Sequence, residues 1–128
     1  MKFNLTNSPE PADGEQITLS KGEISGNITV YTGQQGDFIV ALIPSLNVSG
    51  YGRSETDAHQ SLSENLETFL LDLLELSESD RYLELDQLGW IVNPSFKHQM
   101  SSAYLDELTV LQNFDNPAQV KKTTLQAA

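Results

Sequence analysis

Apolar and polar residues alternate between residues 24 and 31, where Ile28 and Val30 are each followed by a more polar residue. A period of two predicts a strand with one buried face. The run Gly33–Gly36 predicts a turn, and therefore a hairpin. Its second strand, Phe38–Ile43, is apolar at every position, which indicates that both of its faces are covered and that it is central in the sheet.

A third strand and a change of direction are predicted next. Pro44 cannot continue a strand ladder, so residues 44–47 are expected to form a turn. The short run Val48–Tyr51 then predicts a third strand, in which Gly50 permits a bend or bulge. The chain is therefore expected to begin its core with three antiparallel strands.

A long amphipathic helix is predicted to begin at Ser54. Ser54 and Asp57 have the spacing of a capping box, in which each side chain accepts a hydrogen bond from the backbone N–H of the other. The helix is expected to run to Leu76. Apolar residues three and four apart form its buried face: Ala58, Leu62, Leu66, Phe69, Leu70 and Leu73.

Two more helices are predicted after it. Asp80 stands where a residue would cap a short helix that runs through Leu88 and closes on Gly89. Beyond Pro94, apolar residues at helical spacing predict a second amphipathic helix: Phe96, Met100, Tyr104, Leu108 and Leu111.

These elements predict an α+β fold with a three- to four-stranded antiparallel sheet backed by a long helix. We expect residues 1–23 to form a mobile arm, since they contain little that can be buried. Residues 24–92 are expected to form the sheet-and-helix domain, and residues 93–128 a C-terminal helical extension and tail. The tail from residue 120 is expected either to pair as an edge strand or to fray.

Composition limits the class of protein. A chain of 128 residues with 38% hydrophobic residues suits a single domain. It has no cysteine, which excludes disulfides and thiolate chemistry and favours a cytoplasmic location. It has neither an N-terminal apolar run nor the roughly 20 apolar residues that a membrane span requires, so no membrane association is expected.

The charge is concentrated in one part of the chain. Residues 55–86 contain ten Asp and Glu against the single Arg81, which accounts for −9 of the net charge of −11. Such a field repels nucleic acid and attracts basic surfaces. We therefore expect no direct nucleic-acid binding and a basic protein as partner, with Glu64, Glu67 and Asp72 as its tentative contacts.

No catalytic or metal site is predicted. Asp37 lies near the place where a nuclease would hold its metal ions, but the strand after it supplies no second carboxylate, which favours a turn residue. Glu55 and His59 have the spacing of a carboxylate-oriented imidazole, although no nucleophile stands beside them. His98 is isolated. We expect the protein not to be an enzyme and to need no cofactor.

Several short motifs resemble the HicB-like antitoxin family over residues 27–76. They are Gly36-Asp-Phe-Ile-Val-Ala-Leu-Ile-Pro-Ser-Leu, Tyr51-Gly-Arg-Ser54 and Asp57-Ala58, in which Pro44, Leu46, Gly52, Ser54, Asp57 and Ala58 take the places of the family motif. Leu88-Gly-Trp90 is similar to a feature of stand-alone HicB-like proteins. Asn47-Val-Ser-Gly50 replaces the usual Pro-Gly-Cys-like turn, and residues 91–128 contain no convincing DNA-binding motif.

The resemblance implies a truncated ribonuclease H-like fold, assembled as a dimer or higher oligomer. It also implies a partner, because typical members bind and neutralise HicA, a small basic RNA-cleaving toxin. Our leading hypothesis is therefore a HicB-like protein-binding module that occludes such a toxin. The alternative is a stand-alone oligomer of the same fold whose ligand is unknown, and a small-molecule-binding or enzymatic role is the third class.

Overall fold

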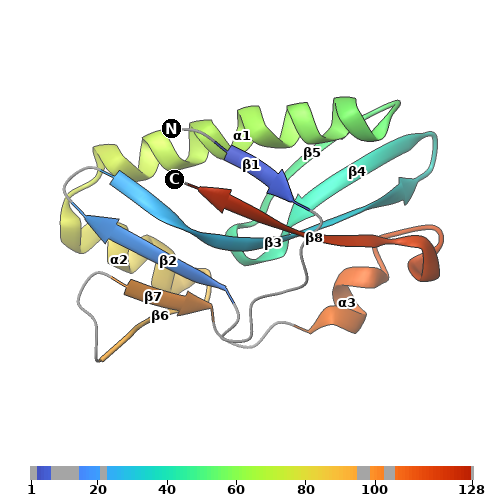
Figure 1. Ribbon diagram of the computed structural model, residues 1–128. Helices are drawn as coiled ribbons and strands as arrows, with labels where there is room; N and C mark the ends of the chain where they lie inside the picture. Colours follow the sequence, from blue (N-terminus) through green and yellow to red (C-terminus); the bar gives the residue numbers. More distant parts are fainter. Residues whose placement is uncertain (1–2, 7–14, 21–22, 95–98, 103–105, 128) are drawn as a thin grey trace.

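One long helix packs against an antiparallel sheet, in an α+β arrangement (Figure 1). The computed structural model describes residues 3–6, 15–20, 23–94, 99–102 and 106–127. The strands in these segments are β1 Phe3–Thr6, β2 Gln16–Ser20, β3 Glu23–Gln35, β4 Phe38–Ile43, β5 Val48–Gly52, β6 Trp90–Val92, β7 Gln99–Ser102 and β8 Lys121–Ala127. The sheet has the order β1-β8-β3-β2-β7-β6, and β4 and β5 extend it from β3.

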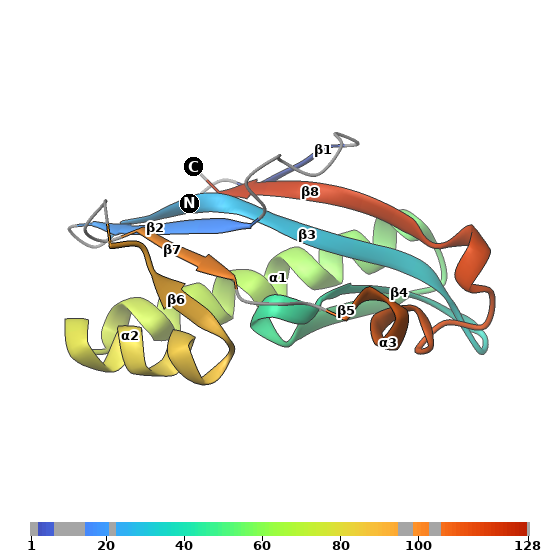
Figure 2. The same cartoon turned by 90° about the horizontal axis from the view of Figure 1, so that it is seen from below.

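The helices are α1 Glu55–Glu75, α2 Glu78–Gln87 and α3 Glu107–Leu111, with 3₁₀ turns η1 Pro44–Leu46 and η2 Pro117–Gln119. Figure 2 shows α1 beneath β2, β3 and β8, with α2 and α3 at opposite ends of the molecule. None of the helices in the described residues is long and apolar enough to span a bilayer.

The predicted hairpin is present, but its first strand is longer than expected. Strand β3 continues through Gln35, which pairs with Phe38, so the turn consists of Gly36 and Asp37 alone. Gly36 has a φ of 62°, which suits glycine. Gly33 is not a turn residue: a Cβ there would lie 2.7 Å from the ring of Phe114, so packing explains the glycine.

Both faces of β4 are covered, and the chain covers them itself. Ile39, Ala41 and Ile43 belong to the main core beneath α1. Val40 and Leu42 pack on a second cluster that contains Tyr31, Val110 and Phe114. Strands β3 and β5 pair on either side of β4, as predicted for a central strand. The chain thus buries both faces of β4 by itself, and the self-association that the resemblance implies stays a prediction.

Helix α1 begins and packs as predicted. The hydroxyl of Ser54 accepts a hydrogen bond of 3.1 Å from the backbone N–H of Asp57. Buried side chains along one face contact the sheet: Ala58, Leu62, Leu66, Leu70 and Leu73. The glycines of β5 do not form a bulge. They allow close approach, because a Cβ at Gly50 would collide with the backbone of Leu62 and one at Gly52 would lie 2.5 Å from the Cβ of Asp57.

Helix α2 is present, although its capping residue differs from the prediction. The hydroxyl of Ser77 accepts a hydrogen bond from the backbone N–H of Asp80, so Ser77 is the N-cap and Asp80 lies in the first turn. The helix ends at Gln87, Leu88 is its C-cap, and Gly89 follows with a φ of 97°, which glycine adopts readily.

The predicted C-terminal helical extension is wrong. Residues 99–102 form β7, α3 has only five residues, and the described chain ends in β8. Apolar residues four apart share one face of a strand as well as of a helix, so the spacing did not distinguish the two. Met100 is buried between the more exposed Gln99 and Ser101, which is the strand pattern. Phe96 and Tyr104 lie outside the described residues.

The tail is neither an edge strand nor frayed, because β8 lies between β1 and β3. Thr123, Thr124 and Leu125 are buried there, and threonine suits a strand although it adds little to an apolar pattern. The expected N-terminal arm also differs from the structure, since residues 3–6 form β1 and residues 16–20 form β2. Residues 7–14 of that arm lie outside the described residues.

Candidate functional site

Nine exposed carboxylates cover the solvent side of α1 and α2. They are Asp57, Glu64, Glu67, Asp72 and Glu75 on α1 and Glu78, Asp80, Glu84 and Asp86 on α2, and we call them the acidic surface. The three predicted contacts, Glu64, Glu67 and Asp72, all belong to it. Their side chains point away from the buried leucines of α1, as the amphipathic pattern requires.

Arg81, the one basic residue between positions 55 and 86, caps the end of α1. Its Nε donates a hydrogen bond of 3.0 Å to the carbonyl of Leu76, and its Nη2 donates one of 2.8 Å to the carbonyl of Leu74. A cation at a helix C-terminus stabilises carbonyl groups that have no partner in the helix. The guanidinium is thus directed at the backbone.

Two leucines interrupt the acidic surface. Leu71 on α1 is 50% exposed, and it lies one turn after Glu67 and one turn before Glu75. Leu83 on α2 is 55% exposed. Single exposed apolar side chains are normal on a protein surface. In an interface with another protein, such side chains are desolvated at the centre and the charges form the rim.

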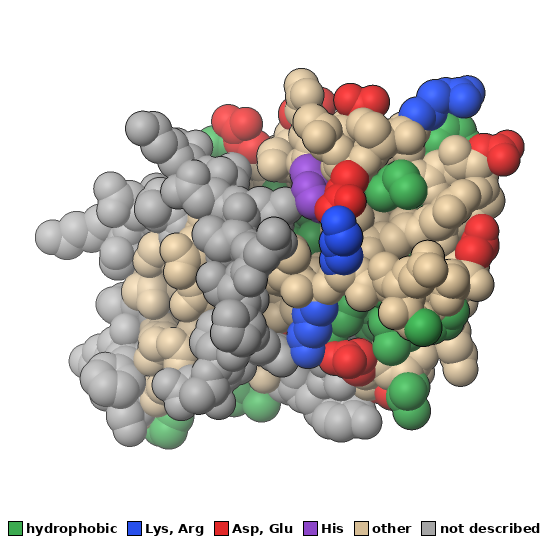
Figure 3. Space-filling view, turned by 45° about the vertical axis from the view of Figure 1, so that its right-hand side comes forward, with side chains coloured by type: hydrophobic (Ala, Val, Ile, Leu, Met, Phe, Trp, Pro, Cys, Tyr) green, Lys and Arg blue, Asp and Glu red, His purple; other side chains and the backbone are tan. Residues whose placement is uncertain are grey.

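A second polar group lies at the start of α1, where acidic, basic and histidine side chains form a band on the surface (Figure 3). The His59 Nε2 and Thr32 Oγ1 atoms are 2.9 Å apart. Both oxygens of Glu55 bind the Nζ of Lys121, at 3.1 and 3.0 Å. Burial lowers the pKa of His59, Glu55 raises it and Lys121 lowers it further, and the net direction is downward.

This group has one feature of a nucleophile–base pair, namely a hydroxyl beside an imidazole. However, Thr32 is only 3% exposed, so a substrate has no access to its hydroxyl. Glu55, which the sequence placed beside His59, is held by Lys121 in an ion pair. The arrangement joins α1 to β3 and β8, and we assign it no chemistry.

Metal chemistry finds no support among the described residues, because no three His, Asp or Glu side chains come together there. Asp37 is an exposed turn residue, as predicted. His98 lies outside the described residues.

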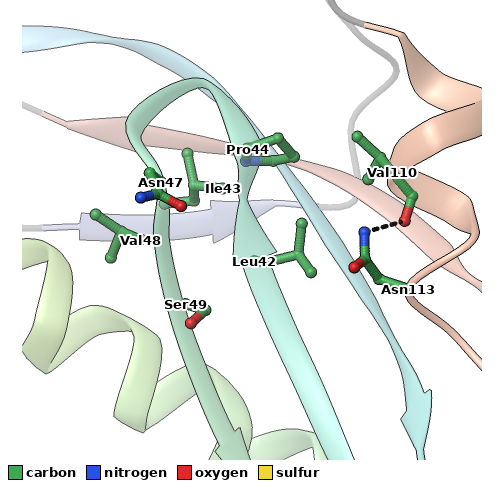
Figure 4. A pocket seen from close by; sticks show the side chains of 8 residues that line it. All are labelled: Leu42, Ile43, Pro44, Asn47, Val48, Ser49, Val110 and Asn113. Carbon is green, nitrogen blue, oxygen red and sulfur yellow. Dashed lines mark hydrogen bonds between the residues drawn. The ribbon is translucent and has the colours of Figure 1, made fainter. Parts of the chain in front are cut away.

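A pocket of about 300 Å³ lies between the β4–β5 connection and α3 (Figure 4). Leu42 and Pro44 line one side, and Val110 and Asn113 line the other. The Asn113 side chain donates a hydrogen bond of 3.0 Å to the carbonyl of Val110, which commits part of its polar capacity. None of the described residues that line the pocket has a charged side chain, so this lining offers shape and apolar surface rather than a reactive group.

Glu15 is a buried acid that sequence reasoning missed. It is 7% exposed, and its Oε2 accepts hydrogen bonds of 2.8 Å from the backbone N–H of Thr29 and from the hydroxyl of Ser45. The indole of Trp90 donates to the carbonyl of Ser45 at 2.9 Å. The only signal in the sequence was a Glu directly before an alternating run, Gln16–Leu19, inside the supposed arm.

The residues of the family motif have structural roles. Pro44 begins η1, and Leu46, the last residue of that turn, is buried. Gly52 allows α1 to approach β5, and Ser54 caps α1. Asp57 supplies the capped N–H, and Ala58 is fully buried. Together they hold the β4–β5 hairpin on the start of α1.

Comparisons with protein-family models, with curated proteins and with solved structures find no match to this chain.

Proposed function

We propose that this protein binds another protein, and that its partner is a small basic protein that contacts the acidic surface. The observation that carries the proposal is the concentration of nine exposed carboxylates on α1 and α2, in a segment whose one basic residue caps a helix end. Like charges on one helix destabilise it by a few tenths of a kcal/mol per pair. A basic partner would relieve that repulsion and would associate faster.

The HicB-like resemblance supports a more specific proposal, an antitoxin that binds a HicA-type RNA-cleaving toxin. The meander β3–β4–β5 followed by a capped helix agrees with the sheet-and-helix module that the resemblance implies. A truncated ribonuclease H-like fold belongs to the same proposal. The mechanism would be occlusion: the carboxylates would cover the basic surface with which the toxin binds RNA, and no bond would be made or broken.

The exposed leucines add a contact that is insensitive to salt. Leu71 and Leu83 would be desolvated by a partner that reaches the centre of the acidic surface. The charges would then control association rate, and the leucines would contribute to residence time.

The alternative is a stand-alone oligomer of the same fold with an unknown ligand. Strand β6 favours it, because β6 pairs only with β7 among the described strands and presents Ile91, 59% exposed, and Val92, 48% exposed. Exposed β-branched residues on an edge strand are a surface on which two copies can meet. Sedimentation at micromolar concentration measures this self-association directly.

Pull-down from a native lysate at low and high salt, followed by mass spectrometry, tests the proposed function. We expect a basic protein whose recovery falls with salt and falls again for the triple variant Glu64→Lys, Glu67→Lys, Asp72→Lys. Asp37→Lys is the matched control, since it reverses an exposed charge away from the acidic surface. Recovery of nucleic acid alone, or of a partner indifferent to salt and to the triple variant, would contradict the proposal.

A further inference from the structure

Strand β5 is at an edge of the sheet, since β4 is its one neighbour among the described strands. An edge strand presents unpaired N–H and C=O groups, and proteins usually guard such edges with charged residues or proline. Val48–Gly52 contains neither. Protection of this edge against pairing with another chain must therefore come from residues outside β5.

Side chains of α1 bond two backbone groups of this edge. The amide Nδ2 of Asn65 donates a hydrogen bond of 2.7 Å to the carbonyl of Ser49. The backbone N–H of Tyr51 donates one of 3.3 Å to the hydroxyl of Ser61. Ser61 and Asn65 are one helical turn apart, so one face of α1 supplies both partners.

These two side chains imitate an added strand. A neighbouring strand of either direction would bond the carbonyl of Ser49 and the N–H of Tyr51, which face the edge on either side of Gly50. Asn65 supplies a donor to the first and Ser61 an acceptor to the second. The approach requires the glycines of β5, because a Cβ at Gly50 would collide with the backbone of Leu62.

We infer that β5 is a latent site for strand addition, which α1 occupies within the same chain through Ser61 and Asn65. The strand that would take their place is β5 of a second copy. A second copy brings the same edge, and two β5 strands related by a two-fold axis run antiparallel. The segment Phe38–Gly52 contains no charged residue, so no like charges would lie opposite each other along the paired strands. In the native chain the edge stays closed.

The test compares the double variant Ser61→Ala, Asn65→Ala with the matched control Gln60→Ala, Thr68→Ala, whose side chains bond only to Glu64 of α1 among the described residues. Alanine favours helix, so α1 is retained, and circular dichroism verifies it. We expect hydrogen exchange of the Tyr51 amide, followed by NMR, to become at least about tenfold faster in the double variant alone. Sedimentation velocity is expected to show a dimerisation step that the wild type and the control lack.

A third variant tests whether the added dimerisation takes place through the edge of β5. Adding Ser49→Lys to the double variant puts a charge on the opened edge and is expected to abolish the added dimerisation. Unchanged exchange at Tyr51 would overturn the inference. So would faster exchange without added dimerisation, or a dimer that persists when Ser49 is replaced.

Discussion

The carboxylate of Glu15 accepts a hydrogen bond of 2.8 Å from the hydroxyl of Ser45, and both residues are buried. The same oxygen accepts a hydrogen bond from the backbone N–H of Thr29. The side chain of Glu15, the residue before β2, therefore connects β2 to β3 and to η1. Ser45 in turn accepts from Trp90, which connects β6 to the same network. The stability of the sheet therefore depends on a residue that precedes its first apolar run.

Glu15→Ala is expected to destabilise the fold by about 2–6 kcal/mol, since two buried donors would lose their acceptor and each costs about 1–3 kcal/mol. Glu15→Gln keeps one acceptor oxygen and is expected to cost less. Urea unfolding followed by circular dichroism measures both. Equal stability of the alanine variant and the wild type would show that Thr29 and Ser45 find other partners.

The free energy of unfolding is expected to fall as the pH drops below about 6.5, and protonation of His59 is expected to cause part of that fall. Burial lowers the pKa of His59 in the folded state below its ordinary value of 6.5. The unfolded chain therefore binds a proton at a pH at which the folded chain does not, so acidification favours unfolding. This loss of stability is absent at pH values above the pKa of His59 in the unfolded chain. It is complete at pH values below the pKa of His59 in the folded chain.

Melting temperatures between pH 8 and pH 5 test this pH dependence. His59→Gln removes the titrating group, and its melting temperature is expected to vary less with pH than that of the wild type. Identical profiles of the two proteins would assign the pH dependence to other groups.

Gly50→Ala is expected to destabilise the protein by about 1–3 kcal/mol, or more if α1 is displaced, because the methyl group would collide with the backbone of Leu62. Gly36→Ala is the comparison, since nothing lies within 4 Å of a Cβ there. It is expected to cost about 1–2 kcal/mol, through the left-handed backbone alone. Thermal unfolding should rank the Gly50 variant as the less stable one.

Leu66→Asp is expected to unfold the protein, while Glu67→Lys should leave its melting temperature within a few degrees of the wild type. Leu66 is fully buried, and an unpaired charge in the core is among the most damaging substitutions. Glu67 is exposed on the acidic surface. Circular dichroism melts of the two variants measure the difference, and similar losses would contradict the observed orientation of α1.

Local patterns predicted the centre of the fold. The Ser54 cap and the apolar face of α1 depend on residues close together in sequence, which a capping motif or a period reports. The unbroken apolar run of β4 also indicated two covered faces, although Val110 and Phe114, which cover one of them, are distant in sequence. The hydrophobic face also located Glu64, Glu67 and Asp72 on the opposite, exposed side. Their role in binding stays a prediction.

The two ends of the chain were mispredicted because their strands depend on distant partners. Strand β8 contains few apolar residues, and its buried Thr123 and Thr124 pair with Val30 and Thr29 of β3, which are distant in sequence. Met100 has the same spacing in a strand as in a helix, so only its neighbours in the sheet distinguish the two. Glu15 shows the same limit, since its hydrogen-bond partners lie 14 and 30 residues further along the chain.

The position of β8 has a consequence for the order in which the chain can fold. Thr32 pairs with Lys121 and Gly26 with Ala127, so these partners are 89 and 101 residues apart. The β3–β4–β5 meander and α1 can form from neighbouring residues, whereas the β3–β8 ladder must close a long loop, which makes it a slow step. During synthesis on the ribosome, β1 therefore cannot pair until residues 121–127 have been made. Until then, the backbone groups of β3 that bond β8 have no strand partner.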